Sequence, residues 1–282
     1  MAEANETGGA AGGVQQEVPR RATGGAAASH RERDLDGRRL KPSTMLSVLY
    51  QDEDLLVVDK PSGLVVHRGW ARDGEVVMTL ARTLASRHVY PVHRLDRGTS
   101  GVLVLALTAA GAGVLGEAFE SGRVRKRYLA LVRGIAPEAG IVDHPIPRAP
   151  GGPRVPAITR YRRLATFERY SWVEAFPETG RLHQVRRHLK HISHPVIGDV
   201  RYGKGEHNRL FRTRFGLYRL ALHAAEISLE HPVSGAPSSF AAPLPADLAG
   251  PLAAMGLALP AAAGGTGAGA AVSPWTARGG AA

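Results

Sequence analysis

The stretch HRLDRGTSGVLVLAL, residues 93–107, joins a polar turn to an uninterrupted apolar run, and it largely decides the fold. Residues 102–107 carry only apolar side chains, as expected for a strand that is buried on both faces of a sheet. The turn before this run holds two glycines and a Thr-Ser pair, which are typical of a tightly shaped loop. Within it Asp96 stands close to Arg94 and Arg97, so it is either a salt-bridged anchor or a catalytic carboxylate held ionised.

Outside this stretch, short apolar runs indicate further elements. We expect other strands at 46–50, 55–59, 127–132, 158–164, 172–176 and 225–229, and helices at 75–86, 109–120, 181–191 and 246–255. Residues 144–156, rich in Pro and Gly, are expected to form a loop. Strands dominate and the helices are interspersed irregularly, which predicts an α+β fold with a mixed or antiparallel sheet.

Composition sets the expected domain boundaries. Residues 1–43, rich in Arg, Gly and Ala, and residues 260–282, mostly Ala and Gly, hold too little apolar surface to offset the entropy cost of folding. We therefore expect two disordered tails around a single domain at 44–259.

The absence of Cys excludes a disulfide scaffold, a thiolate zinc site and a Cys nucleophile. Neither a secretory signal nor a membrane-spanning helix is indicated, so we expect a cytoplasmic protein without a membrane partner.

Basic residues give the chain a formal net charge of +11. The run at 123–128 is basic and ends in Tyr128, and the region 201–218 interleaves bases with aromatic residues. Basic grooves with stacking rings suit single-stranded or flipped nucleotides. A solvated loop with ordinary core aromatics, in a chain whose Arg content reflects its genome, explains the same pattern. No GxGxxG or Walker sequence occurs, so a nucleotide cofactor is not expected.

The helix expected at 181–191 has one informative face, because Leu182, Val185 and Leu189 form an apolar stripe. At 100° per residue Arg186 lies on the border of that stripe, whereas Arg187 points away to solvent. A partly covered Arg needs a carboxylate partner, and Asp96 is a good candidate. An Arg that merely extends along the edge of the core is the alternative.

Four histidines near this helix, His183, His188, His191 and His194, raise the question of zinc. Their spacing does not match HExxH, and no Asp or Glu ligand set accompanies them. We therefore expect ordinary structural histidines and no metal.

Six motifs in order carry a resemblance to a known family: KPSG (60–63), HRLDRGTSG (93–101), KRY (126–128), TGRLHQVR (179–186), HPVIGD (194–199) and LHA (222–224). Together they resemble an RluA-like pseudouridine synthase, over about residues 45–245. The segment VHR (66–68), and the lack of an S4-like RNA-binding domain before it, resemble the tRNA pseudouridine(65) synthase group.

The resemblance implies a single catalytic domain with an RNA-binding cleft. It implies that a uridine in structured RNA, with tRNA as the expected substrate, is flipped out of its stack and isomerised to pseudouridine. By resemblance, Asp96 assists cleavage of the glycosidic bond, Tyr128 stacks on the uracil and Arg186 is the basic partner of Asp96. The RNA-binding residues implied are Arg94, Arg97, Lys126, Arg127 and Arg181. The reaction needs neither cofactor nor metal, and no obligatory protein partner is implied.

Three other functions stay open at this point. The first is a pseudouridine synthase that acts on ribosomal RNA, alone or together with tRNA. A non-catalytic RNA-binding protein is the second, although an inactive relative is expected to have lost Asp96 or Tyr128. A metal- or water-dependent hydrolase is the third, and it needs a second positioned acid.

Overall fold

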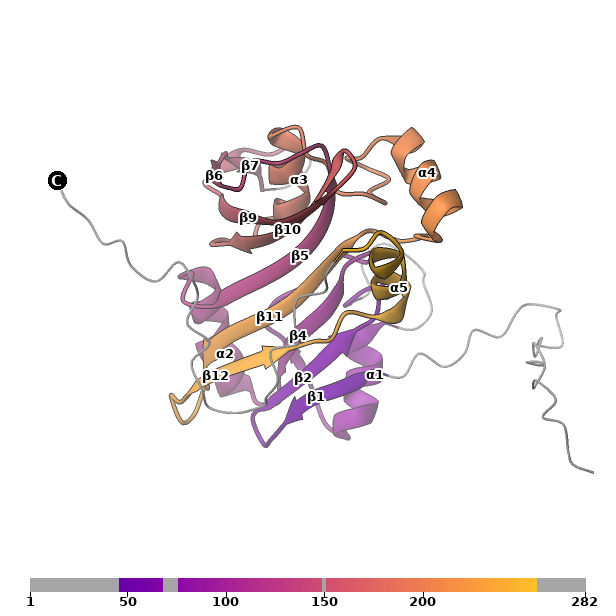
Figure 1. The fold of residues 1–282 in the computed structure, drawn as a ribbon. Coiled ribbons are helices and arrows are strands. Elements are labelled where there is room, and N and C mark those ends of the chain that lie inside the picture. The colour runs from indigo at the N-terminus through magenta and orange to yellow at the C-terminus, as the bar shows by residue number, and fades with distance from the viewer. Residues whose placement is uncertain (1–45, 68–75, 149–150, 258–282) are drawn as a thin grey trace, which may run out of the picture. The chain divides into compact units, whose positions relative to one another are not determined.

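A computed structural model of the 282-residue chain describes residues 46–67, 76–148 and 151–257 (Figure 1). The chain divides into two units, Met1–Thr44 and Met45–Ala282, and every described residue belongs to the second. The tails expected at 1–43 and 260–282 lie outside the described residues, as does Arg68 of the VHR segment.

Strands and helices alternate irregularly along the described residues. The strands are β1 (Ser47–Gln51), β2 (Leu55–Lys60), β3 (Tyr90–Pro91), β4 (Ser100–Ala106), β5 (Arg125–Arg133), β6 (Ala139–Asp143), β7 (Ile146–Pro147), β8 (Arg154–Val155), β9 (Ile158–Phe167), β10 (Tyr170–Pro177), β11 (Leu222–Glu230) and β12 (Pro237–Ala241). The helices are α1 (Val77–Ala85), α2 (Ala109–Glu120), α3 (Gln184–His191), α4 (Gly205–Phe215) and α5 (Ala246–Ala254).

One large mixed sheet organises this part of the chain. Its strand order is β1-β2-β4-β11-β5-β10-β9-β6, with β12 paired to β11 and β3 paired to β4. The β4–β11 pair is parallel and the other pairs are antiparallel. Figure 1 shows β11 and β5 crossing the middle of the sheet. The expected α+β fold with a mixed sheet is thus confirmed.

Strands β2 and β4 are buried on both faces, which explains their continuous apolar sequences. Leu56 and Leu103 pack with α1 on one face, whereas Val57 and Val104 pack with α2 on the other. Helix α2 begins where Thr108 accepts a hydrogen bond at its Oγ1 from the backbone N–H of Gly111, at 3.1 Å. The strand expected at 102–107 and the helix at 109–120 are confirmed.

The other half of the sheet has its own core. Trp172 on β10 is fully buried there, with Val185 and Leu189 of α3 in the same cluster. Helix α4 contributes Phe211, which is also fully buried. Val185 and Leu189 therefore fix this helix against the sheet and determine where its remaining side chains lie, whereas Leu182, the third residue of the expected stripe, precedes α3 and is only partly buried.

Gly101 lies where parallel strands β4 and β11 meet. Its φ is +111°, a conformation that other residues rarely adopt, and a Cβ there would collide with the backbone carbonyl of Ala224. This close approach brings the loop that precedes β4 against the start of β11. Gly101, the last residue of the motif at 93–101, is thus needed to assemble the sheet beside Asp96.

Three expectations about local structure need correction. The region 201–218 is not simply a loop, because α4 occupies much of it and buries Phe211. The expected loop at 144–156 contains the short strands β7 and β8, which pair with each other. Strands β6 and β12 were not expected, because their five-residue sequences mix polar and small residues.

None of the helices among the described residues is long and apolar enough to span a membrane.

Candidate active site

The loop that carries Asp96 runs between β3 and β4 and is held from beneath by the loop after β2. The backbone N–H of Gly63 donates to the carbonyl of Arg97 at 2.7 Å, and Ser62 Oγ donates to the carbonyl of Gly98 at 2.8 Å. These bonds fix the backbone on the C-terminal side of Asp96. The KPSG motif therefore serves the site indirectly, by shaping the loop of the carboxylate.

Lys60 lies under the same loop and is fully buried. Its Nζ donates to the carbonyls of Pro61 at 2.8 Å, Leu64 at 2.6 Å and Arg97 at 3.3 Å. Burial, and then the positive charge of Arg219, lowers the pKa of Lys60 to about 7. Three carbonyl acceptors match the three donors of an ammonium group, so Lys60 links both loops.

Arg186 on α3 joins two carboxylates that lie far apart in the sequence. Its Nη1 donates to Asp96 Oδ2 at 2.8 Å, while Nε and Nη2 donate to Asp199 Oδ2 and Oδ1 at 2.7 and 2.9 Å. Bidentate pairing with Asp199 fixes the plane of the guanidinium and leaves one edge for Asp96. The ion pair expected between Arg186 and Asp96 is therefore present.

The charges of this network stabilise one another. Burial opposes ionisation of Arg186, but its hydrogen bonds and charge interactions with Asp199 and Asp96 outweigh that effect and raise its pKa. Burial also opposes ionisation of Asp199, yet the Arg186 hydrogen bonds and the backbone N–H groups of Tyr202 and Arg201 lower its pKa. Arg186 and Asp199 are thus held charged, and the Asp96 side chain, which pairs with Arg186, is 18 % exposed.

Strand β5 contributes alternate residues to two faces of the sheet. Lys126 and Tyr128 line the same pocket as Asp96, whereas Arg127 pairs with Glu226 at 3.0 Å and does not line it. Lys126 Nζ donates to the carbonyl of Thr179 at 3.3 Å, and burial lowers its pKa to about 8. Burial, and then the negative charge of Asp96, raises the pKa of Tyr128, so its phenol stays neutral.

The pocket at this point has a volume of about 290 Å³. The predicted residues that line it are Arg94, Asp96, Lys126, Tyr128, Arg181 and Arg186. Arg94 and Arg181 are exposed, and Arg97 is exposed but is not among the residues that line the pocket. Glu120, an exposed residue at the end of α2, also lines it. The cavity combines an ion-paired carboxylate, a neutral phenol and a basic rim. This combination suits one nucleotide, with its planar base against the phenol ring and its anionic phosphates at the basic rim.

The expectation that Arg187 points to solvent is wrong. It is only partly exposed, because its Nε donates to the hydroxyl of Tyr202 at 2.9 Å and its Nη1 to the carbonyl of Pro147 at 3.3 Å. Helical periodicity places Arg187 away from the apolar stripe, but the segments carrying Tyr202 and Pro147 cover that side of α3. A second layer of chain therefore covers a face that would be solvated on an isolated helix.

Reasoning from sequence did not place three further side chains at this site. Asp199 belongs to the HPVIGD motif, from which no role was predicted for it, although its carboxylate is fully buried and binds Arg186. His183 and Tyr202 lie beside Asp96 and Arg187, and they hydrogen-bond each other at 2.9 Å. A carboxylate that follows Ile-Gly in an apolar segment was the available signal for Asp199, because such a carboxylate is buried only when paired.

The histidines expected to be structural make separate contacts. His188 hydrogen-bonds Thr159 Oγ1 at 2.9 Å, His191 stacks on His144 with ring centroids 3.7 Å apart, and His194 hydrogen-bonds the carbonyl of Arg133 at 2.9 Å. Each therefore has a structural partner.

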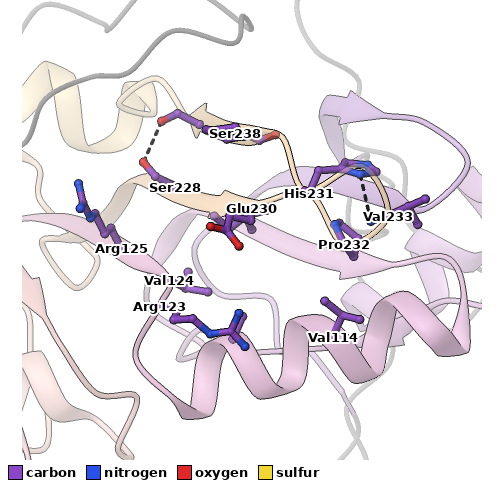
Figure 2. A pocket seen from close by; sticks show the side chains of 15 residues that line it. Val114, Arg123, Val124, Arg125, Ser228, Glu230, His231, Pro232, Val233 and Ser238 are labelled. Carbon is purple, nitrogen blue, oxygen red and sulfur yellow. Dashed lines mark hydrogen bonds between the residues drawn. The ribbon is translucent and has the colours of Figure 1, made fainter.

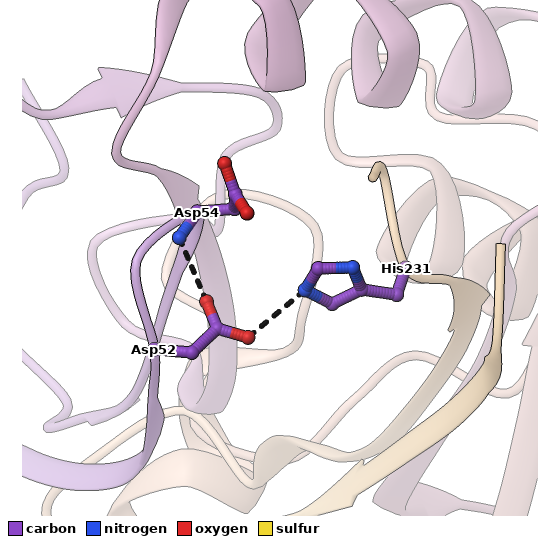
Figure 3. A group of neighbouring side chains, drawn as sticks. All are labelled: Asp52, Asp54 and His231. Carbon is purple, nitrogen blue, oxygen red and sulfur yellow. Dashed lines mark hydrogen bonds and ion pairs between the residues drawn. The ribbon is translucent and has the colours of Figure 1, made fainter. Parts of the chain in front are cut away.

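Another group, Asp52, Asp54 and His231, has the residue types of a metal site (Figure 3). Asp52 Oδ1 accepts from the backbone N–H groups of Asp54 and Leu55 at 2.8 and 2.7 Å. Asp52 Oδ2 accepts from Tyr50 Oη at 2.7 Å and is 2.9 Å from His231 Nε2. These bonds use the oxygens of Asp52 to join the turn after β1 to the end of β11, so the group is explained as a structural anchor.

A second cavity, of about 530 Å³, lies between α2 and the hairpin of β11 and β12 (Figure 2). Arg123 and Arg125 line it together with Glu230 and His231, and Arg123 pairs with Glu117 at 2.8 Å. The basic run at 123–128 is thus divided, because Lys126 and Tyr128 line the first pocket and Arg123 and Arg125 the second. None of the residues predicted for the active site lines this cavity.

Comparison with known proteins identifies the family. Residues 54–191 match the family model described as RNA pseudouridylate synthase. A tRNA pseudouridine synthase C of Vibrio cholerae is 41 % identical over 216 residues, which cover 68 % of this chain and 88 % of the relative. That of Pectobacterium carotovorum is 45 % identical over 222 residues, and the match spans 71 % of this chain but only 59 % of the relative.

Solved structures give the same result. Human RNA Pseudouridylate Synthase Domain Containing 4 superposes with a TM-score of 0.63 at 30 % identity, over 76 % of this chain and 94 % of the human chain. Human RNA Pseudouridylate Synthase Domain Containing 1 superposes with a TM-score of 0.60 at 28 % identity, over 74 % and 89 % of the two chains. The pocket formed by Asp96, Tyr128 and Arg186 lies within a fold shared with these proteins, and the chain belongs to the RNA pseudouridylate synthase family.

Proposed function

We propose that this chain isomerises a uridine of tRNA to pseudouridine. The observation that carries the proposal is the ion-paired network in which Arg186, fixed by buried Asp199, holds Asp96 at the pocket. The relatives named tRNA pseudouridine synthase C support tRNA as the substrate class. Position 65 is the expected target because the VHR segment resembles that group. Action on tRNA also favours the cytoplasm as the place of the reaction.

In the proposed reaction the target uridine leaves its stack and enters the pocket. Tyr128 offers a neutral aromatic face for the uracil, and Lys126, Arg94 and Arg181 attract the surrounding phosphates. Asp96 assists cleavage of the bond between N1 and the sugar, either at the sugar or as a base. The uracil then turns, and C5 forms the new bond to the sugar.

Water must be kept from the pocket during this sequence, because it would release free uracil. Arg186 and Tyr128 both lie at the wall next to Asp96 and limit the space beside the carboxylate. The proposal therefore assigns these side chains two tasks, positioning the reacting groups and excluding water.

The experiment that tests this function offers the purified chain three substrates: a tRNA transcript, ribosomal RNA fragments and a linear oligonucleotide with the same target uridine. Pseudouridines are mapped by carbodiimide-based sequencing, with and without EDTA. We expect modification of folded tRNA, poor modification of the oligonucleotide, and activity with EDTA on tRNA folded in monovalent salt. Efficient modification of ribosomal RNA but not tRNA would overturn the substrate assignment.

A further inference from the structure

His183 has an unusual backbone at the entrance of α3. Its φ and ψ are 55° and 30°, in the left-handed region, although it is not a glycine. The side chain lines the pocket and is 16 % exposed. Strained backbone conformations at pocket residues often maintain a functional geometry, so the role of this imidazole needs explanation.

Tyr202 and Arg187 hold the imidazole from behind. Arg187 Nε donates to Tyr202 Oη at 2.9 Å, and Tyr202 Oη lies 2.9 Å from His183 Nδ1. One assignment satisfies all three groups: Tyr202 Oη accepts from Arg187 and donates its proton to Nδ1, and His183 carries its own proton on Nε2. Burial lowers the pKa of His183, with the nearby arginines adding to the effect and Asp96 opposing it, so the ring is neutral.

The Nε2 atom lies beside the carboxylate without binding it. It is 3.8 Å from Asp96 Oδ1, which is too long for a hydrogen bond. Asp96 Oδ2 is occupied by Arg186, at 2.8 Å. A fixed N–H donor therefore lies at the pocket wall, next to the group that assists cleavage of the glycosidic bond.

We propose that His183 Nε2–H donates a hydrogen bond to a carbonyl oxygen of the flipped uracil, and that this stabilises negative charge on the ring. The inference rests on the proposed function. As the bond from N1 to the sugar breaks, its electron pair passes to the ring and spreads onto the carbonyl oxygens. The pair then forms the bond from C5 to the sugar, after which C5 loses a proton and N1 gains one. His183 keeps its proton throughout and acts as a donor aimed at developing charge.

Two substitutions at this position separate the donor from the backbone. Ala and Gln meet a similar steric cost in the left-handed conformation, but only Gln carries an N–H near the position of Nε2. We expect His183→Ala to lower kcat on tRNA by about 10²-fold with a smaller change in KM, because one donor to developing charge is worth that much. We expect His183→Gln to recover at least about tenfold of that loss. Equal kcat values for the two variants, whether near wild type or equally reduced, would overturn the proposal. Thermal unfolding of both variants is the check that they are folded.

A second measurement does not depend on turnover. Long-range ¹H–¹⁵N NMR of the free protein reports which imidazole nitrogen of His183 carries the proton. We expect protonation at Nε2 in the wild type and a mixture of tautomers in Tyr202→Phe, which removes a single oxygen. A wild-type ring protonated at Nδ1 would overturn the proposal. If the wild type modifies no RNA while its ring is protonated at Nε2 and shifts in Tyr202→Phe, the proposed function fails and the donor geometry stands.

Discussion

At the scale of single residues, Arg186 determines the geometry of the site because one guanidinium serves two carboxylates. Asp199 takes the edge formed by Nε and Nη2, and Asp96 takes Nη1. Neither carboxylate could be paired in this way by a Lys, whose ammonium group lacks the planar fork. The direction of the Asp96 carboxylate therefore depends on a residue 90 positions later in the chain.

Arg186→Ala tests this dependence. The substitution leaves the fully buried Asp199 charged and without its guanidinium, and breaking a buried pair typically costs about 3–5 kcal/mol. We expect urea unfolding to show a loss of that order and tRNA modification to fall at least about 10²-fold. Lys190→Ala, at an exposed position of the same helix, is the control and should change neither measurement appreciably. Comparable effects from the two variants would contradict the network.

His223 gives the fold a dependence on pH. It is fully buried, its Nδ1 lies 2.8 Å from Ser100 Oγ and its Nε2 lies 3.1 Å from the carbonyl of Ala242. Burial lowers the pKa of His223 to about 4, whereas an unfolded His has a pKa of about 6.5. Between these values the unfolded chain binds more protons, so the free energy of unfolding falls as the pH is lowered from about 6.5 to 4.

Urea unfolding at a series of pH values measures this effect. One such His contributes at most about 1.4 kcal/mol per pH unit in that window. His223→Gln cannot titrate there, and its unfolding free energy should fall less steeply than that of the wild type. Identical slopes for the two proteins would show that His223 does not carry the dependence.

At the scale of elements, the parallel contact between β4 and β11 brings the Asp96 loop to the centre of the sheet. It pairs Ser100 with His223 and Gly101 with Ala224. The strands approach closely only because Gly101 has no side chain. Substituting Gly101, at this contact, and Gly113, at an exposed position of helix α2, by Ala compares the close strand contact with an ordinary helical position.

Gly101→Ala should be strongly destabilising, because its φ of +111° is unfavourable for Ala and the new Cβ meets the Ala224 carbonyl. Gly113→Ala, in α2, meets nothing within 4 Å and should raise the free energy of unfolding by about 0.5–1 kcal/mol. Thermal unfolding distinguishes these opposite shifts. A Gly101→Ala protein as stable as the wild type would show that the strands do not meet as described.

The elements also show what sequence can and cannot predict. The strand at 102–107 and helix α2 were predictable because their apolar patterns are strong and local. Helix α4 was not, because its sequence is mostly polar and its packing depends on contacts of Phe211 with residues such as Tyr170. At the site, periodicity identified the face of Arg186 but not its second partner, Asp199. The covered position of Arg187 depends on Tyr202, which lies in a later loop that helical periodicity does not describe.

At the scale of the whole molecule, the described domain contains three hydrophobic clusters and the pocket within 46–257. The basic segment at 1–43 has a sequence that cannot bury a core, so its contribution should be electrostatic. Deleting residues 1–43 should leave a folded and active enzyme, and it should flatten the dependence of tRNA affinity on salt. Circular dichroism and anisotropy titrations over a range of salt concentrations measure these two effects. Unfolding on truncation would contradict the prediction that the core folds without residues 1–43. An unchanged salt slope would contradict their electrostatic contribution to tRNA affinity.

The account depends centrally on Asp96 as the group that makes pseudouridine in this pocket. The most direct measurement is pseudouridine formation in a tRNA transcript under single-turnover conditions, with wild type and Asp96→Asn at enzyme concentrations that saturate the RNA. Asn keeps the shape of the side chain but removes its charge, so RNA affinity should stay near wild type. The account predicts product with the wild type and a loss of at least about 10²-fold with Asp96→Asn. Turnover by Asp96→Asn within about tenfold of the wild type would contradict it.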